Sequence, residues 1–203
     1  MEESGLFEYW FAYLFALGFC LWFPTYVVKT RGKSIPTWGL AFCIVVLFLF
    51  LPLLAMSLIR DVLPSVWLSF MTHGYESPNV SLILGTIHKM ARLDQLYVCL
   101  AVISILIAMG QSVFAAWLIY VRHNRESLMR AIRIMWSSAL FVVLAAGVLP
   151  YVILGTHGVS VVLPSALTMA AYIAVLMCIT AYLRMSDVIA DHYPISHQTK
   201  KAK

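Results

Sequence analysis

The sequence predicts an all-α polytopic integral membrane protein whose chain crosses the bilayer five times. Of its 203 residues, 62% are hydrophobic and only 11% carry a charge, whereas a soluble domain is typically about 45–50% apolar and about 25% charged. A soluble fold of this size has too much surface for its interior to hold so many apolar side chains. The composition therefore excludes an ordinary soluble enzyme, a disordered regulator and a small secreted domain held together by disulfides.

Five apolar stretches are long enough to cross the hydrocarbon core as helices, which requires about 20 residues each. The predicted spans are Gly5–Val28, Trp38–Ile59, Leu96–Val121, Met135–Gly155 and Val159–Leu183. We treat residues 1–203 as one membrane domain, with an outer segment at 60–95 and a tail at 184–203. The first span is interpreted as a retained helix, because the chain start lacks the positive region of a signal peptide.

Basic residues fall mainly on one side of this predicted bundle. The loops 29–37 and 122–134, together with the tail, hold eleven lysines and arginines, whereas the opposite side holds only Arg60, Lys89 and Arg92. Cytoplasmic loops carry an excess of such residues. The pattern therefore places the N-terminus outside and the C-terminus in the cytoplasm, as an odd number of spans requires.

The basic loops also indicate contact with anionic lipid headgroups. Gly32 and Pro36 end the helices around the first basic loop, and the second basic loop carries four arginines. A cytoplasmic partner or a phosphate ligand is the alternative for that second loop. The candidate headgroup residues are Lys29, Arg31, Lys33, Arg122, Arg125 and Arg130.

The outer segment 60–95 is too apolar for a solvated loop. Its stretch 66–71 is largely apolar, and from Ser81 onward the spacing predicts an amphipathic helix with one apolar face. Three interpretations stay open: a helix lying in the membrane interface, a docking surface for a periplasmic or membrane partner, and a lid over a lateral opening. The candidate partner-binding residues are Trp67, Phe70, Ile83, Ile87 and Met90.

Residues that carry chemistry are scarce inside the spans, where ionisable groups would mark proton paths or ion sites. Glu8 is the only acidic residue within a span, and we interpret it as a solvated carboxylate at the outer interface. All histidines lie in predicted loops or tails, and the four cysteines lie in separate apolar runs. Because no metal-ligand, haem-ligand or nucleophile pattern appears, we expect no catalytic residue, no cofactor and no metal site.

Mild polar and small residues predict where helices touch. Gln111 should face the bundle, because its amide is costly to expose to lipid. Small residues at 145–147 in the fourth span and at 165–171 in the fifth predict close packing of these two helices. Pro24, Pro52, Pro150 and Pro164 lie near helix ends, where they predict kinks with local repair of the freed carbonyl. A gating hinge is the alternative.

The order of features in the last four spans resembles a known family. Pro52-Leu53-Leu54 ends one helix at the outer face, and a long outer segment follows it. Next come a helix, an arginine-bearing loop and a further helix that begins at Trp136-Ser137. Over roughly Leu40–Leu183 this organisation resembles the membrane module of the paraquat-inducible protein A family. The resemblance implies a four-helix membrane module with one extra N-terminal helix, and a role as a partner of envelope-spanning lipid-transport proteins. The chain lacks that family's zinc-binding cysteine pairs, and we carry over no functional residue.

These observations favour a non-catalytic module of the bacterial cytoplasmic membrane, a subunit or accessory partner of a larger envelope assembly related to lipid transport. We expect membrane lipids and other membrane or periplasmic proteins as partners, and no nucleic acid. One alternative is a membrane immunity or exclusion protein against a pore-forming toxin, which also needs only helices and specific loops. The other is a lipid-modifying membrane enzyme that would use His73, Glu76 or His88 on the outer side.

Overall fold

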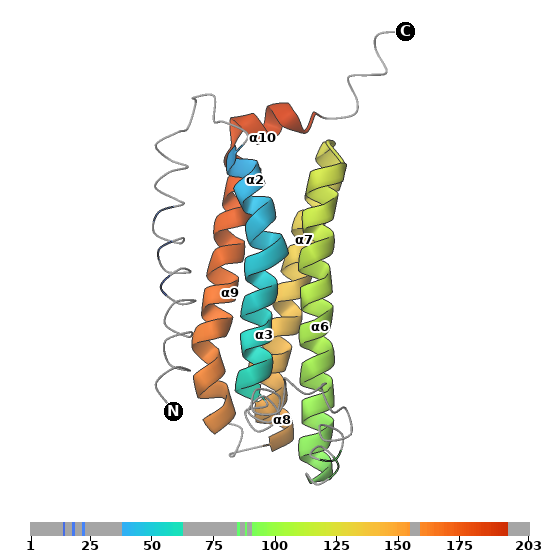
Figure 1. Cartoon of the computed structure of the whole chain (residues 1–203), viewed down its shortest axis with the longest axis vertical. Helices are drawn as coiled ribbons and strands as arrows, with labels where there is room; N and C mark the ends of the chain where they lie inside the picture. The colour runs from blue at the N-terminus through green and yellow to red at the C-terminus, as the bar shows by residue number, and fades with distance from the viewer. Residues whose placement is uncertain are drawn as a thin grey trace, which may run out of the picture.

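The computed structural model describes residues 38–62, 91–154 and 159–194, together with Leu14, Gly18, Trp22, Gly85 and His88. All regular secondary structure in these residues is helical (Figure 1). Four helices are long and apolar enough to cross a membrane: Gly39–Arg60, Arg92–Val121, Arg125–Ile153 and Ser165–Met185. The chain is therefore an all-α integral membrane protein. The predicted span Gly5–Val28 lies almost wholly outside the described residues.

The first described span is one continuous helix with a wider turn in its middle. It consists of α2 (Trp38–Val45), the π turn η1 (Val46–Phe50) and α3 (Leu51–Val62). The next span, α6 (Arg92–Val121), has 30 residues and is therefore about 45 Å long. Because the hydrocarbon core is only about 30 Å thick, the ends of α6 extend into the polar layers.

The third described span has the same composite build as the first. It consists of α7 (Arg125–Val143), the π turn η2 (Leu144–Val148) and α8 (Leu149–Leu154). It begins at Arg125 rather than at the predicted Met135, so its first turns carry arginines. The last span, α9 (Val159–Met185), leads into the short helix α10 (Asp187–His192), which lies across the end of the bundle (Figure 1).

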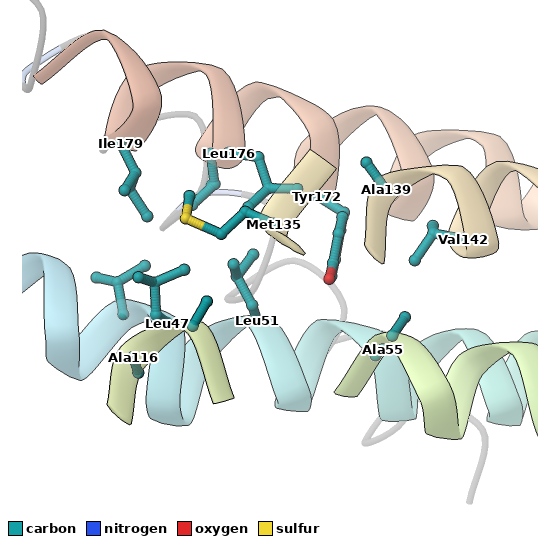
Figure 2. Close-up of a cluster of buried hydrophobic side chains, with 14 of the residues drawn as sticks. Leu47, Leu51, Ala55, Ala116, Met135, Ala139, Val142, Tyr172, Leu176 and Ile179 are labelled. Carbon is teal, nitrogen blue, oxygen red and sulfur yellow. The ribbon is translucent and has the colours of Figure 1, made fainter. Parts of the chain in front are cut away.

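The four spans pack as a square. Helix α3 packs against α6 and α9, and α7 packs against the same two neighbours, so α3 lies diagonally opposite α7 and α6 lies diagonally opposite α9. The core fills the axis of this square, where Leu47 and Leu51 face Met135 and Leu176 (Figure 2). Each helix thus contributes one stripe of side chains to a single continuous core.

The outward faces of the bundle are as apolar as its interior. Along α6, exposed large side chains recur at intervals of three, four or seven residues, at Leu96, Leu100, Ile103, Ile107 and Phe114. A soluble monomer rarely exposes so large an apolar patch. Lipid chains are the matching environment for this face.

Each π turn ends two residues before a proline. Phe50 ends η1 before Pro52, and Val148 ends η2 before Pro150. In a regular α-helix a proline ring clashes with the carbonyl four residues earlier and leaves that carbonyl without its donor. The wider π turn relieves this conflict locally at both prolines.

Close packing of the last two spans is confirmed. The Oγ of buried Ser165 donates to the main-chain carbonyl of Ala146 at 3.4 Å, so the two backbones approach one another closely. Gly147 lies in the same region, but a Cβ added there would be 3.9 Å from the sulfur of Met169, an ordinary van der Waals distance. The close approach therefore rests on the small side chain of Ser165 against the main chain of Ala146.

Candidate functional site

The buried polar groups of the bundle gather around one tyrosine in its centre. The side chain of Tyr172 in α9 is fully buried, and its hydroxyl lies 2.9 Å from Oγ of Ser112 in α6 and 3.0 Å from Oγ of Ser138 in α7. Figure 2 shows this hydroxyl pointing from α9 into the core. The cluster of these three hydroxyls, the hydroxyl cluster below, joins three of the four spans.

Counting hydrogens shows how the hydroxyl cluster is satisfied. Ser112 also lies 3.0 Å from the carbonyl of Ala108, and Ser138 lies 2.6 Å from that of Met135. Four contacts are thus available to three hydroxyl hydrogens, because each hydroxyl has only one to donate. Both serines donate to their main-chain carbonyls, so the tyrosine hydroxyl can donate to only one of the two serines at a time. Every hydroxyl in the cluster nevertheless has a partner, as a buried polar group requires.

A second polar contact links α6 to α7 and involves the residues that directly precede Ser112 and Ser138. The amide Nε2 of Gln111 donates to Oγ of Ser137 at 3.3 Å, which confirms the prediction that Gln111 faces the bundle. Its Oε1 is buried without a hydrogen-bond partner, as are the hydroxyls of Tyr97 and Thr180. These unpaired atoms cost stability in a low-dielectric interior.

Among the described residues, the buried polar side chains in the middle of the bundle are neutral. Hydroxyls and one amide are the polar side chains that the hydroxyl cluster and its neighbours present, and the remaining surroundings are aliphatic. Neutral hydroxyls of this kind hold helices together in lipid, where a hydrogen bond averages about 0.6 kcal/mol. In the described part of the bundle, Tyr172 thus lies in a cluster of buried, mainly apolar side chains.

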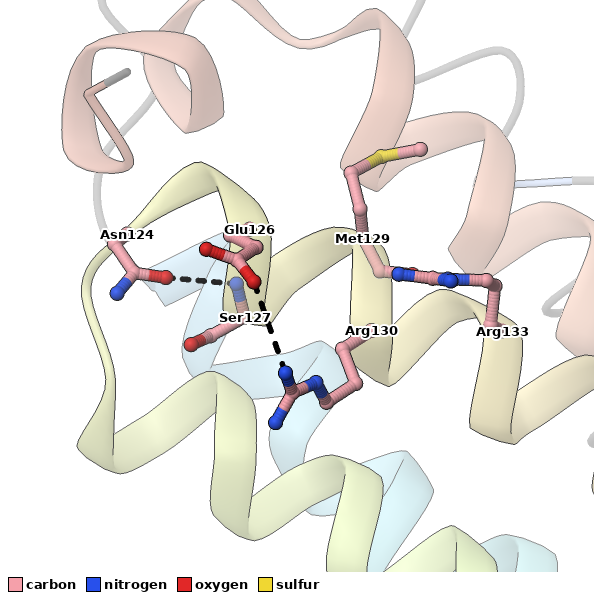
Figure 3. Close-up of polar contacts among 6 residues, drawn as sticks. All are labelled: Asn124, Glu126, Ser127, Met129, Arg130 and Arg133. Carbon is pink, nitrogen blue, oxygen red and sulfur yellow. Dashed lines mark hydrogen bonds and ion pairs between the residues drawn. The ribbon is translucent and has the colours of Figure 1, made fainter. Parts of the chain in front are cut away.

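The end of the bundle that carries α10 is the charged end. Here Asn124 caps α7, its Oδ1 accepting from the main-chain N–H of Ser127 at 2.7 Å (Figure 3). One turn further, the exposed side chains of Glu126 and Arg130 form an ion pair at 3.7 Å. Exposed pairs of this kind contribute little, so the guanidinium of Arg130 is still available to ligands in solution.

Helix α10 is fastened to the charged end by Tyr193. The ring of Tyr193 is fully buried, and its hydroxyl donates to the main-chain carbonyl of Ile119 near the end of α6, at 2.5 Å. A second link runs from the main-chain N–H of Arg125 to the carbonyl of Pro194, at 3.5 Å. Burial raises the pKa of Tyr193 to about 12. The tail is therefore part of the fold as far as Pro194.

Two histidines meet beside this anchor. The ring centroids of His123 and His192 lie 5.2 Å apart, and the edge of the Tyr193 ring meets the His123 ring at 5.9 Å. His123 follows α6 and His192 ends α10, so 69 positions of sequence separate them. Sequence reasoning missed this pair, because only the fold of α10 back onto the bundle brings the two rings together.

Some of the candidate residues named from the sequence are among the described residues, and the others are not. Arg122, Arg125 and Arg130 lie together at the charged end, where Arg122 and Arg130 are exposed. Of the histidines predicted to lie on the outer side, His88 is described, and its carbonyl accepts from Gln95 at 3.2 Å. The remaining candidates lie outside the described residues: Lys29, Arg31, Lys33, Trp67, Phe70, His73, Glu76, Ile83, Ile87 and Met90.

The fold and these sites define a helical integral membrane protein whose described core consists of neutral side chains and whose described arginines are concentrated at the end that carries α10. Comparison of the chain with protein-family models, with curated proteins and with solved structures finds no match. The assignment to the integral membrane proteins therefore rests on the length and apolar composition of the four described helices.

Proposed function

We propose that this protein is a non-catalytic membrane module that serves as an accessory subunit of a larger envelope assembly in a bacterial cytoplasmic membrane. The hydroxyl cluster is the observation that supports this role. Its three hydroxyls bond to one another and to main-chain carbonyls in the middle of the bundle, and aliphatic side chains surround them. Such an interior suits a scaffold better than a conduit or a reaction centre.

The proposed topology has five spans, with the N-terminus outside and the C-terminus in the cytoplasm. Among the described residues, the charged end holds Arg122, Arg125, Arg130, Arg133 and Arg184, whereas Arg60 and Arg92 lie at the opposite end. An excess of arginine favours the cytoplasmic side. Anionic lipid headgroups are the proposed partners of the exposed arginines at that end.

Cysteine labelling tests this topology. In a variant whose native cysteines are replaced, Ser77→Cys should react with a membrane-impermeant maleimide in intact cells. Ser196→Cys, in the tail, should react only after the membrane is permeabilised. Labelling of both positions from the same side would overturn the proposed orientation.

The outer segment 60–95 is the proposed docking surface for the rest of the assembly. Its candidate contacts are Trp67, Phe70, Ile83, Ile87 and Met90, and the partners would be membrane or periplasmic proteins. The link to lipid transport rests on the resemblance in helix order described above. Helix α3 ends and α6 begins at the end of the bundle opposite α10, so a partner bound near these helix ends would leave the charged end free.

Photocrosslinking from defined positions tests the docking role. A photoreactive amino acid at Trp67 or Phe70 should crosslink to the same protein partner in cells. The matched control is the same amino acid at Ile103, which is exposed on the lipid-facing side of α6 and should yield lipid adducts only. Lipid adducts alone at all three positions, with a lone protein in native mass spectrometry, would contradict the proposal.

A further inference from the structure

The pair formed by His123 and His192 has the geometry of a chelating site. Two imidazoles bound to one zinc ion at about 2.0–2.1 Å in a tetrahedral arrangement have ring centres roughly 5 Å apart. The observed centroid separation is 5.2 Å, with the ring planes inclined at 57°. Both histidines are exposed to solvent, so an ion can reach them without any rearrangement of the bundle.

The two rings are held in place before any ion arrives. His192 directly precedes Tyr193, whose buried hydroxyl is bonded to the carbonyl of Ile119. The Tyr193 ring also contacts both histidine rings, at centroid distances of 5.9 Å to His123 and 5.7 Å to His192. A site whose ligands are already ordered loses less entropy on binding than a flexible one.

The chemistry of the two ligands favours a divalent cation of the transition series. Neutral imidazole is a ligand for zinc, copper and nickel rather than for magnesium or calcium. Helix α10 carries Asp187 and Asp191 and no lysine or arginine, so its charge opposes that of the nearby arginines. Within the described residues, no group of three or more histidine, cysteine or acidic side chains forms a metal cage, so water would complete the coordination.

We propose that His123 and His192 together bind one divalent transition-metal ion, which ties α10 to the turn between α6 and α7. The ion would bridge a residue that follows α6 and a residue that ends α10, and would reinforce the Tyr193 anchor. This site lies at the charged end and does not depend on the accessory role proposed above.

Zinc titration of the full chain in detergent tests the site, with the protein purified through a tag that contains no histidine. The wild type should bind about one Zn²⁺ per chain in competition with a chromophoric chelator. His123→Ala and His192→Ala should each weaken the apparent affinity at least about tenfold, because a single remaining imidazole no longer chelates. The apparent zinc affinity of the double variant should lie within about twofold of that of either single variant.

Two matched controls locate the site. His88→Ala removes an exposed histidine at the opposite end of the bundle, and His197→Ala removes the last histidine of the tail; neither should change zinc affinity. Electron paramagnetic resonance of bound Cu²⁺ should show two nitrogen ligands in the wild type and one in His192→Ala. Equal zinc affinity in the wild type, His123→Ala and His192→Ala would overturn the proposal, as would loss of binding in either control.

Discussion

The phenolic oxygen of Tyr172 in α9 lies 2.9 Å from Oγ of Ser112 in α6, although the two residues are 60 positions apart in the chain. Because α6 and α9 are diagonal neighbours in the square bundle, this bond crosses the centre of the core. The same oxygen reaches Ser138 of α7. One side chain thus fixes the relative depth of three helices in the membrane.

Two substitutions of Tyr172 distinguish the contribution of its hydroxyl to stability from that of its ring. Tyr172→Phe should lower the free energy of unfolding by only about 1 kcal/mol, because both serines still donate to their own main-chain carbonyls. Tyr172→Ala also empties the core and should cost about 3–5 kcal/mol. Unfolding in mixed detergent micelles at increasing sodium dodecyl sulfate measures both values.

The matched control for this comparison is Tyr151→Phe, which removes a hydroxyl from a ring that is 68% exposed. It should leave the free energy of unfolding unchanged within experimental error. Suppose instead that Tyr172→Phe proved as damaging as Tyr172→Ala. The main-chain carbonyls would then not be sufficient partners for the two serine hydroxyls, and the assignment of the serine hydrogens to those carbonyls would be wrong.

Ionisation of Tyr193 should release α10 at alkaline pH. Burial raises the pKa of Tyr193 from 10.0 to about 12, so the docked state favours the neutral phenol. The stability that docking provides is fully present below about pH 10 and decreases as the pH rises towards 12, because the undocked phenol ionises first. Absorbance at alkaline pH, compared with Tyr193→Phe, should reveal one tyrosine that titrates near pH 12.

The consequence for the tail can be followed by proteolysis. Tyr193→Phe removes the hydrogen bond to Ile119 and should make cleavage between residues 186 and 194 faster already at neutral pH. Tyr120→Phe, at a ring that is 68% exposed, should leave the cleavage rate unchanged. A tail cleaved equally fast in all three proteins would show that the Tyr193 bond does not hold α10.

The cap on α7 is a local interaction of ordinary size. Asn124→Ala should lower the free energy of unfolding by about 1 kcal/mol, because the N–H of Ser127 loses its acceptor. Asn124→Asp keeps an acceptor oxygen at the helix N-terminus and should retain most of the stability. Equal losses in the two variants would argue that the cap itself contributes nothing.

The π turns should tolerate a change that a regular helix does not. A π turn holds one residue more than the α turn it replaces, so deletion of Val148 combined with Pro150→Ala should restore a regular helix and keep the register on both sides. Deletion of Leu140 with the same proline change should rotate the rest of the helix by about 100°. Gel filtration in detergent should show a monodisperse first variant and an aggregated second one.

Much of the fold was predictable because lipid imposes simple rules on a sequence. The described helices begin or end close to the predicted spans at Trp38, Val121 and Val159, since a run of apolar residues in hydrocarbon must satisfy its backbone as a helix. The inward direction of Gln111 followed from the cost of exposing an amide to lipid. The early start of α7 was less visible, because its arginines look like a loop until Asn124 is seen to cap a helix.

The candidate sites were harder to predict. The hydroxyl cluster combines a tyrosine with two serines from three spans, and serine and tyrosine alone are too common in membrane helices to signal a contact. The pairing of His123 with His192 depends on the anchor formed by Tyr193, whose burial is invisible in a polar tail. In both cases the informative quantity is which helix faces which, and a single sequence does not contain it.

The sequence by itself determined that this chain belongs in a membrane, roughly where its helices run and which ends carry positive charge, because those properties depend on the local content of apolar and basic residues. Only the tertiary structure decided that Tyr172 links α9 to α6 and α7 and that π turns precede Pro52 and Pro150. It also decided that α10 folds back and brings His192 beside His123. These are relations between segments that are distant in the chain or adjustments of backbone geometry. They arise from packing, which local composition does not encode.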